Sequence, residues 1–137
     1  QTSGKEGADR IRGHAANLLD EACLLPADRH WDAIWMSQFL DCFSEEQITS
    51  ILRRAARVMD NDSRLYIMET FWNRQRFEPA SLCLTMTSVY FTAMANGNSK
   101  MYHSDDLLKQ VERAGLEVVK MHDGIGQGHT IVEVKKR

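Results

Sequence analysis

The chain has no apolar run close to the roughly 18 residues that would suggest a membrane span. It has three cysteines, an odd number without paired spacing, which fits a reducing compartment better than a disulfide framework. Its net charge of −2 gives no electrostatic reason to expect nucleic acid or an anionic membrane as a partner. No signal peptide follows the first residue, so we expect a cytoplasmic protein.

Other features are missing from the N-terminal end. Gln1 is not an initiator methionine, and residues 1–9 are polar and patternless, like the frayed end of a helix that began upstream. No Gly-rich phosphate or nucleotide loop precedes the first convincing strand. A chain of 137 residues is long enough for one core and too short for two domains. We therefore expect a fragment, the back half of a cofactor-binding domain.

The most informative segment, residues 31–46, predicts a buried strand, a short loop and a capped helix. Residues 32–37 form a short apolar run, which is typical of a strand covered on both faces. Ser44 and Gln47 have the spacing of a capping box, so a helix is predicted to start at Glu45. Ligand sites in open α/β sheets lie just beyond the carboxyl end of a strand, which is where this loop falls.

The helix that follows is predicted to be amphipathic. Its apolar positions recur at helical spacing and are Ile48, Ile51, Leu52, Ala55 and Val58. Its solvent face is predicted to carry Arg53, Arg54 and Arg57. Turn residues at 60–63 end the helix, and residues 65–70 read as the next buried strand. This order predicts two adjacent parallel strands joined by a right-handed crossover.

The remaining segments predict a weak strand, two helices and a pair of strands. In chain order they span residues 10–16, 81–94, 104–115, 116–121 and 130–134. Pro79 suits the first turn of the first of these helices, which is apolar nearly all round. Ser104 is the expected N-cap of the second, and Gly115 is expected to close it. The Gly-rich turn at 124–128 is so short that the last two strands must be antiparallel.

Three of these stretches together resemble a known family. The run from residue 32 to 46 (DAIWMSQFLDCFSEE), then 65–69 (LYIME), then 107–116, resembles the S-adenosylmethionine-dependent O-methyltransferases of the hydroxyindole, caffeate and polyketide type. The resemblance covers nearly the whole chain from about Arg10. It implies an α/β fold, a partial class I methyltransferase (Rossmann-like) sheet made of that family's strands three to seven, with an antiparallel last strand. The Gly-rich cofactor loop and the N-terminal dimerisation domain would then lie upstream of Gln1.

The resemblance implies S-adenosyl-L-methionine as the cofactor. The residues it places against that cofactor are Asn17, Leu18, Trp35, Met36 and Ser37. Asn17 falls where the family commonly has an Asp that contacts the adenine, although a turn residue after a strand is the alternative interpretation. Trp35 is equally well explained as a core residue.

Asp41 and Glu69 are the catalytic candidates. Asp41 falls where many relatives carry the His that takes the proton from the substrate hydroxyl, and Glu69 matches the acid that supports this base. An ordinary carboxylate, with a pKa of about 4, is a poor base for a phenol near 10. Partial burial would raise the pKa of Asp41, and two neighbouring acids can share a proton.

Replacing the family's His by Asp41 leaves three possibilities: an activated base, an already acidic acceptor, or no methyl transfer. An Asp that caps the following helix is the structural alternative.

The expected substrate is a small hydroxylated, aromatic or polyketide-like acceptor. The residues predicted to contact it are Gln38, Met86, Tyr90 and Met94, and ordinary core packing is an equal alternative for the last three. His103 is a candidate for a second supporting residue, and no metal site is predicted. The complete protein is expected to be a homodimer and the isolated fragment to be inactive. A methyltransferase-like, non-catalytic subunit for binding or dimerisation is the alternative function.

Overall fold

The structure, a computed structural model, describes residues 10–95 and 97–137. Its elements are β1 (Ala33–Ser37), α1 (Glu45–Val58), β2 (Arg64–Glu69), α2 (Glu78–Met94), α3 (Ser104–Arg113), β3 (Leu116–Ile125) and β4 (His129–Lys136). Two short 3-10 turns, η2 (Leu40–Cys42) and η3 (Trp72–Arg74), follow the parallel strands. The polar N-terminal segment 1–9 lies outside the described residues.

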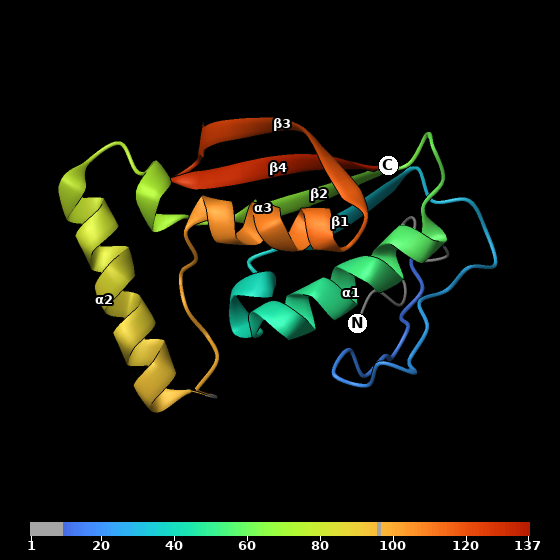
Figure 1. The fold of residues 1–137 in the computed structure, drawn as a ribbon, viewed down its shortest axis with the longest axis horizontal. Coiled ribbons are helices and arrows are strands. Elements are labelled where there is room, and N and C mark those ends of the chain that lie inside the picture. The colour runs from blue at the N-terminus through green and yellow to red at the C-terminus, as the bar shows by residue number, and fades with distance from the viewer. Residues whose placement is uncertain (1–9, 96) are drawn as a thin grey trace.

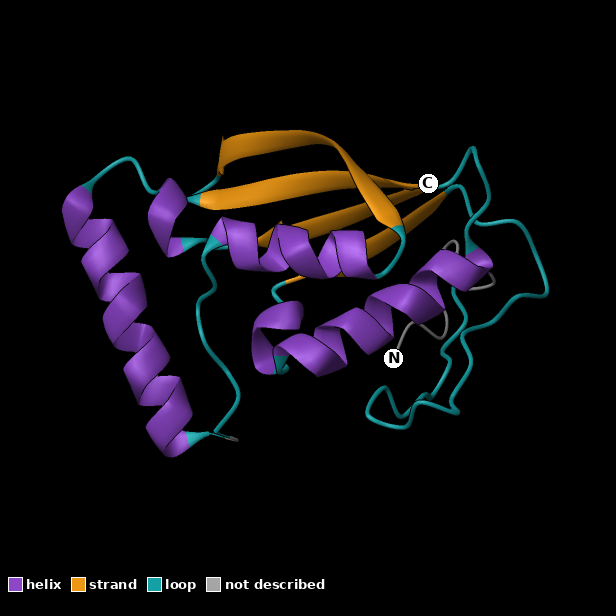
Figure 2. Ribbon diagram, viewed as in Figure 1, coloured by secondary structure: helices purple, strands orange, loops and turns teal. Residues whose placement is uncertain are grey.

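The strands form one four-stranded sheet in the order β1-β2-β4-β3. β1 and β2 are parallel, and β4 is antiparallel to both β2 and β3. Figures 1 and 2 show α1 and α3 side by side over one face of this sheet, whereas α2 stands apart at one end. This is the arrangement expected for the C-terminal part of a class I methyltransferase sheet, and the predicted fold class is confirmed.

Helix α1 begins at Glu45, as predicted, because its capping box is complete. The Ser44 hydroxyl accepts from the Gln47 amide at 3.4 Å, and the Gln47 side chain accepts from the Ser44 amide at 2.9 Å. The predicted apolar positions of α1 are buried, apart from a half-buried Val58. They pack in one core with side chains of the sheet and α3, which include Leu65, Ile67, Leu107, Val111, Leu116, Val132 and Val134.

Arg54 does not lie on the solvent face of α1, and that prediction is wrong. It is only 3% exposed. Its guanidinium donates to the carbonyl oxygens of Asp20 at 2.9 Å, Cys23 at 3.1 Å and Leu18. A buried charge is tolerated when it is fully hydrogen-bonded, and here it also satisfies the carbonyls of an irregular segment. Arg54 therefore fixes the segment before β1 against the middle of α1.

The predicted strand at residues 10–16 is absent, so the sheet has four strands where five were expected. Within the described residues β1 pairs only with β2, which leaves its other edge without a neighbour. A strand needs partners for its backbone N–H and C=O groups. The described residues supply no such partner for segment 10–16, which is irregular instead.

The second amphipathic helix, α3, starts one residue differently from the prediction. His103 is the N-cap, and its Nδ1 atom accepts from the Asp105 amide at 3.2 Å. Ser104 is the first helical residue. Gly115 follows the helix with a φ of 78°, a left-handed conformation that suits glycine and ends the helix as predicted.

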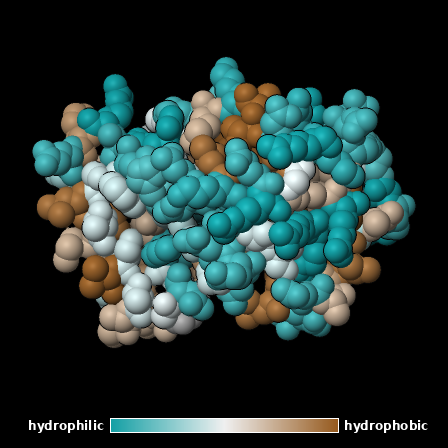
Figure 3. All heavy atoms as spheres, viewed as in Figure 1, coloured by the Kyte–Doolittle hydropathy of each residue, from teal (hydrophilic) through white to brown (hydrophobic). Residues whose placement is uncertain are grey.

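Helix α2 ends at Met94 and has Pro79 in its first turn, as expected, but it begins at Glu78, three residues before the predicted start. It has no buried residue. Its most exposed apolar side chains are 57% to 71% exposed and belong to Leu82, Met86, Val89, Tyr90 and Met94. Figure 3 shows hydrophobic residues gathered on the end of the molecule that α2 occupies. No helix of the described residues is long and apolar enough to cross a membrane.

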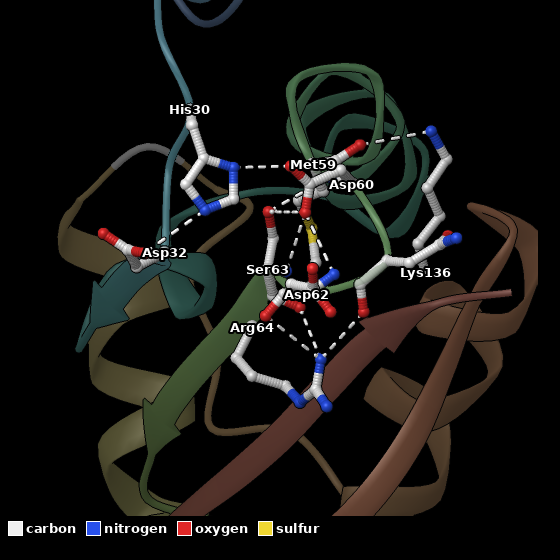
Figure 4. Close-up of polar contacts among 9 residues, drawn as sticks. His30, Asp32, Met59, Asp60, Asp62, Ser63, Arg64 and Lys136 are labelled. Carbon is white, nitrogen blue, oxygen red and sulfur yellow. Dashed lines mark hydrogen bonds and ion pairs between the residues drawn. The ribbon is translucent and has the colours of Figure 1, made fainter.

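A polar cluster ties the segments that enter the two parallel strands (Figure 4). His30 contacts Asp60 through Nδ1 at 2.5 Å and Asp32 through Nε2 at 3.2 Å. The other carboxylate oxygen of Asp60 accepts from the Ser63 amide and hydroxyl, which closes the turn between α1 and β2. This cluster lies at the amino ends of β1 and β2, so it leaves their carboxyl ends for the site described next.

Candidate functional site

The candidate site lies where the parallel strands β1 and β2 end at the same edge of the sheet. Glu69 is the last residue of β2 and is only 4% exposed. Its Oε1 atom accepts from the amides of Phe39 at 2.9 Å and Leu40 at 2.8 Å. The buried carboxylate at the end of β2 therefore holds the loop that follows β1.

Gln38 joins β1 to this loop in a strained conformation. Its φ is 47°, in the left-handed region that non-glycine residues rarely adopt. Its amide donates to Met68 O at 2.9 Å, and its side-chain Nε2 lies 3.5 Å from Glu69 Oε2. Such strain persists where surrounding contacts over-determine the backbone, and it is commonest at functional sites.

Asp41 sits in the middle of the loop, on η2, and is partly buried. Burial raises the pKa of its carboxyl group, and a hydrogen bond from the Cys42 thiol at 3.5 Å partly opposes that increase. The direction is the one that a catalytic base needs if it is to accept a proton from a hydroxyl group.

Glu69 has the more strongly perturbed carboxyl group. Burial raises its pKa to about 7, the amides of Phe39 and Leu40 lower it, and the charge of Asp41 raises it. The structure thus brings Asp41 and Glu69 together as an electrostatically coupled pair. Proton sharing between them stays a prediction, because no hydrogen bond joins their carboxyl groups in the described part of the chain.

Both acids line the same small cavity. Its lining is formed by Leu40, Asp41, Glu69, Thr70, Phe71, Tyr102 and Leu107. Tyr102 is buried, and its hydroxyl donates to Phe43 O at 2.6 Å. Burial raises the pKa of Tyr102, which keeps it protonated as a donor.

The sequence analysis missed Tyr102. A signal was present: it is the apolar residue just before the N-cap of α3, and Leu107 lies four residues after that cap, the spacing of a hydrophobic staple.

The residues predicted to contact a cofactor are divided between two places. Met36 is part of the core, whereas Trp35 is 55% exposed and its ring lies 5.9 Å from that of Tyr66. Trp35 and the exposed Ser37 lie on β1, beside its unpaired edge. The core interpretation of Trp35 is therefore wrong, and the cofactor interpretation stays a prediction.

Asn17 and Leu18 lie in a turn of the segment before β1. Asn17 Oδ1 accepts from the Leu19 amide at 3.1 Å, the contact of a turn residue, and Leu18 is held by Arg54. No hydrogen bond between described residues links this turn to β1. The structure therefore supports the turn interpretation of Asn17 and leaves its contact with a cofactor as a prediction.

The substrate residues predicted on α2 do not reach the cavity. Met86, Tyr90 and Met94 are exposed, so the alternative of core packing is wrong within the described residues. His103 caps α3 and its ring packs edge-on against Trp72 at 5.0 Å, which explains it without a catalytic role. Over residues 10–95 and 97–137, no group of His, Cys, Asp or Glu could hold a metal ion.

Comparison with known structures identifies the fold. No protein-family profile and no curated protein sequence matches the chain. Among solved structures, TnmH is similar over 98% of this chain, with a TM-score of 0.80 and 19% identity. The O-methyltransferase NcsB1 of neocarzinostatin biosynthesis, bound to S-adenosyl-L-homocysteine and 1,4-dihydroxy-2-naphthoic acid, is similar over 88%, with a TM-score of 0.68 and 19% identity. The mitomycin 7-O-methyltransferase MmcR is similar over 77%, with a TM-score of 0.66 and 20% identity.

The chain spans only 30% to 37% of the length of these three proteins. At this level of identity the likeness establishes the fold and not the activity. The candidate site lies at the carboxyl ends of parallel strands, the position where open α/β sheets bind ligands.

Proposed function

We propose that this chain is the C-terminal part of an S-adenosyl-L-methionine-dependent O-methyltransferase domain that acts on a small hydroxylated, aromatic or polyketide-like acceptor. The observation that carries the proposal is the pair Asp41 and Glu69 at the shared carboxyl ends of β1 and β2. NcsB1 and MmcR, which share the fold, are O-methyltransferases. The Gly-rich cofactor loop and a dimerisation domain would belong to the upstream part of a cytoplasmic, homodimeric protein.

The residues on β1 fit one side of the cofactor. Trp35 offers an exposed aromatic face for an adenosyl group, and the Ser37 hydroxyl can both donate and accept a hydrogen bond. S-adenosyl-L-methionine supplies an electrophilic methyl group when bound. Because the opposite half of such a site is not part of this chain, the isolated 137 residues should bind the cofactor weakly and be inactive.

Asp41 acts in this proposal as the general base. It accepts the proton of the acceptor hydroxyl while the acceptor oxygen is held in line with the methyl group. Its raised pKa improves the match with a hydroxyl group, and acceptors more acidic than simple phenols suit it best. Glu69 does not touch the acceptor; it fixes the backbone that presents Asp41.

The test uses the complete protein, S-adenosyl-L-methionine and a panel of hydroxylated aromatics, with methylated product detected by mass spectrometry. Asp41→Asn should lower the rate by about 10²–10⁴-fold, the range for loss of a general base. Glu69→Gln should shift the pH–rate profile, and Asp62→Asn, an exposed residue at the other end of the sheet, should change neither. Unchanged pH–rate profiles in both acid variants would contradict the proposed function. Tight calorimetric binding of the cofactor to the isolated 137 residues would contradict the proposal that the chain is only part of the cofactor-binding domain.

A further inference from the structure

The loop that carries Asp41 is held by two separate elements. In the sheet, Glu69 accepts from the amides of Phe39 and Leu40. The second element is residues 99–104, here called the strap, which run between α2 and α3 and bond the loop twice. The Lys100 amide donates to Asp41 O at 3.0 Å, and the Tyr102 hydroxyl donates to Phe43 O at 2.6 Å.

The ring of Tyr102 is itself fixed in place. The Lys100 ammonium lies 4.6 Å from the centre of the Tyr102 ring and 3.5 Å from Glu45 Oε1 on α1. Tyr102 also belongs to the core, where it lines the same small cavity as Asp41 and Glu69. A buried aromatic ring with one satisfied hydroxyl is a rigid donor.

The strap is also bonded to α2 and η3. The Met101 amide donates to Ser88 Oγ at 2.9 Å, and Ser104 N donates to Asn73 Oδ1 at 2.9 Å. The strap is therefore fixed by hydrogen bonds at several points, so its contacts can position the loop that carries Asp41.

We infer that Tyr102 is a positioning residue for Asp41: its hydroxyl, bonded to Phe43 O, and the Lys100 amide, bonded to Asp41 O, fix the backbone from Asp41 to Phe43 and turn that carboxyl toward the cavity shared with Glu69. The importance of this positioning for catalysis rests on the proposed function, but the positioning of the loop by Tyr102 does not. The titratable groups around Asp41 are Glu69 on β2, Cys42 on the loop and Tyr102 on the strap, and the nearest strap cation, Lys100, is engaged with Glu45.

The test is Tyr102→Phe in the complete protein, which removes one hydroxyl and keeps the ring. Hydrogen exchange of the peptide covering residues 39–43 should become about tenfold faster, the effect of losing one buried hydrogen bond. With the loop open to water, the pKa of Asp41, followed by ¹³C-aspartate NMR, should move down toward its ordinary value. Tyr66→Phe is the matched control, because its hydroxyl makes no hydrogen bond to the described residues.

Unchanged exchange at residues 39–43, or equal effects of Tyr66→Phe, would overturn the inference. If Tyr102→Phe does not fold, Lys100→Met removes the cation over the ring and the Glu45 contact while it keeps the amide; it should change exchange in the same direction, and no change would again count against Tyr102. If the exchange at residues 39–43 and the pKa of Asp41 change but the complete protein transfers no methyl group, the proposed function fails and the positioning role of Tyr102 stands. If the protein transfers a methyl group but neither quantity changes, the proposed function stands and the positioning role fails.

Discussion

Helices α1 and α2 are both rich in apolar residues, yet one is covered and the other is not. α1 buries Ile48, Ile51, Leu52 and Ala55 against the sheet, whereas α2 buries none of its residues. α1 has its apolar residues on one stripe, and α2 has them all round. The difference teaches that a high apolar content alone does not predict where a helix packs. An apolar stripe on one face does, because it identifies the face that packs against the sheet.

The largest expected contrast between the helices lies in their leucines. Leu52→Ala on α1 should lower the free energy of unfolding by about 2–5 kcal/mol, because it opens a cavity in a filled core. Leu82→Ala on α2 should change it by less than about 0.5 kcal/mol, because that side chain is exposed. Urea unfolding of both variants measures this. Equal losses would show that α2 is covered in solution.

Next is a pH effect at the carboxyl end of β2. Folding raises the pKa of Glu69 from 4.5 to about 7, so the folded state binds more protons, and stability falls as the pH rises through that window. Glu69→Gln should remove this slope and gain stability at pH 8, on the order of 3 kcal/mol. Urea midpoints between pH 4 and 8 follow it, with the exposed Glu112→Gln as control. Parallel slopes in parent and variant would contradict the burial effect.

A smaller effect is expected at the helix starts. α1 has a complete capping box at Ser44, whereas the N-cap of α2, Phe77, makes no side-chain cap. Ser44→Ala should cost about 1 kcal/mol of stability. Phe77→Asp should add a cap to α2 and increase its helicity in circular dichroism. A loss of helicity in the second variant would mean that the exposed Phe77 ring supports α2 in some other way.

The smallest effect is expected at the amino ends of the strands. The hydrogen bond to Asp60 raises the pKa of His30 above 6.5, so its contribution to stability is complete below that pH and is lost as the pH rises through the folded pKa. His30→Gln should therefore reduce the melting temperature at pH 5.5 more than at pH 8.5. His14→Gln, on an exposed loop, is the control. A melting temperature lowered equally at both pH values would leave only a packing role for His30.

The elements that could be predicted are those with local signals. The capping box at Ser44, the stripe of α1 and Gly115 after α3 each depend on residues within a few positions, so they are visible in the sequence. The two acids were named from the family resemblance, and they lie close together because the carboxyl ends of parallel strands converge at one edge of the sheet.

The missed features depend on distant partners. The burial of Arg54 requires the carbonyls of residues 18–23, and the role of Tyr102 requires Phe43. Neither pairing leaves a periodic pattern. The prediction of a strand at 10–16 failed for the same reason, since a strand needs a neighbour and the described residues supply none there.

The place of β4 has a consequence for synthesis on the ribosome. β4 is made after every other described element, yet it lies between β2 and β3 and pairs with both. Leu65 in β2 pairs with Val134 in β4, so most of the sheet can form only after Val134 has been translated. Until then β2 exposes an open edge to any nascent strand nearby, and a premature stop codon before β4 would make that exposure permanent.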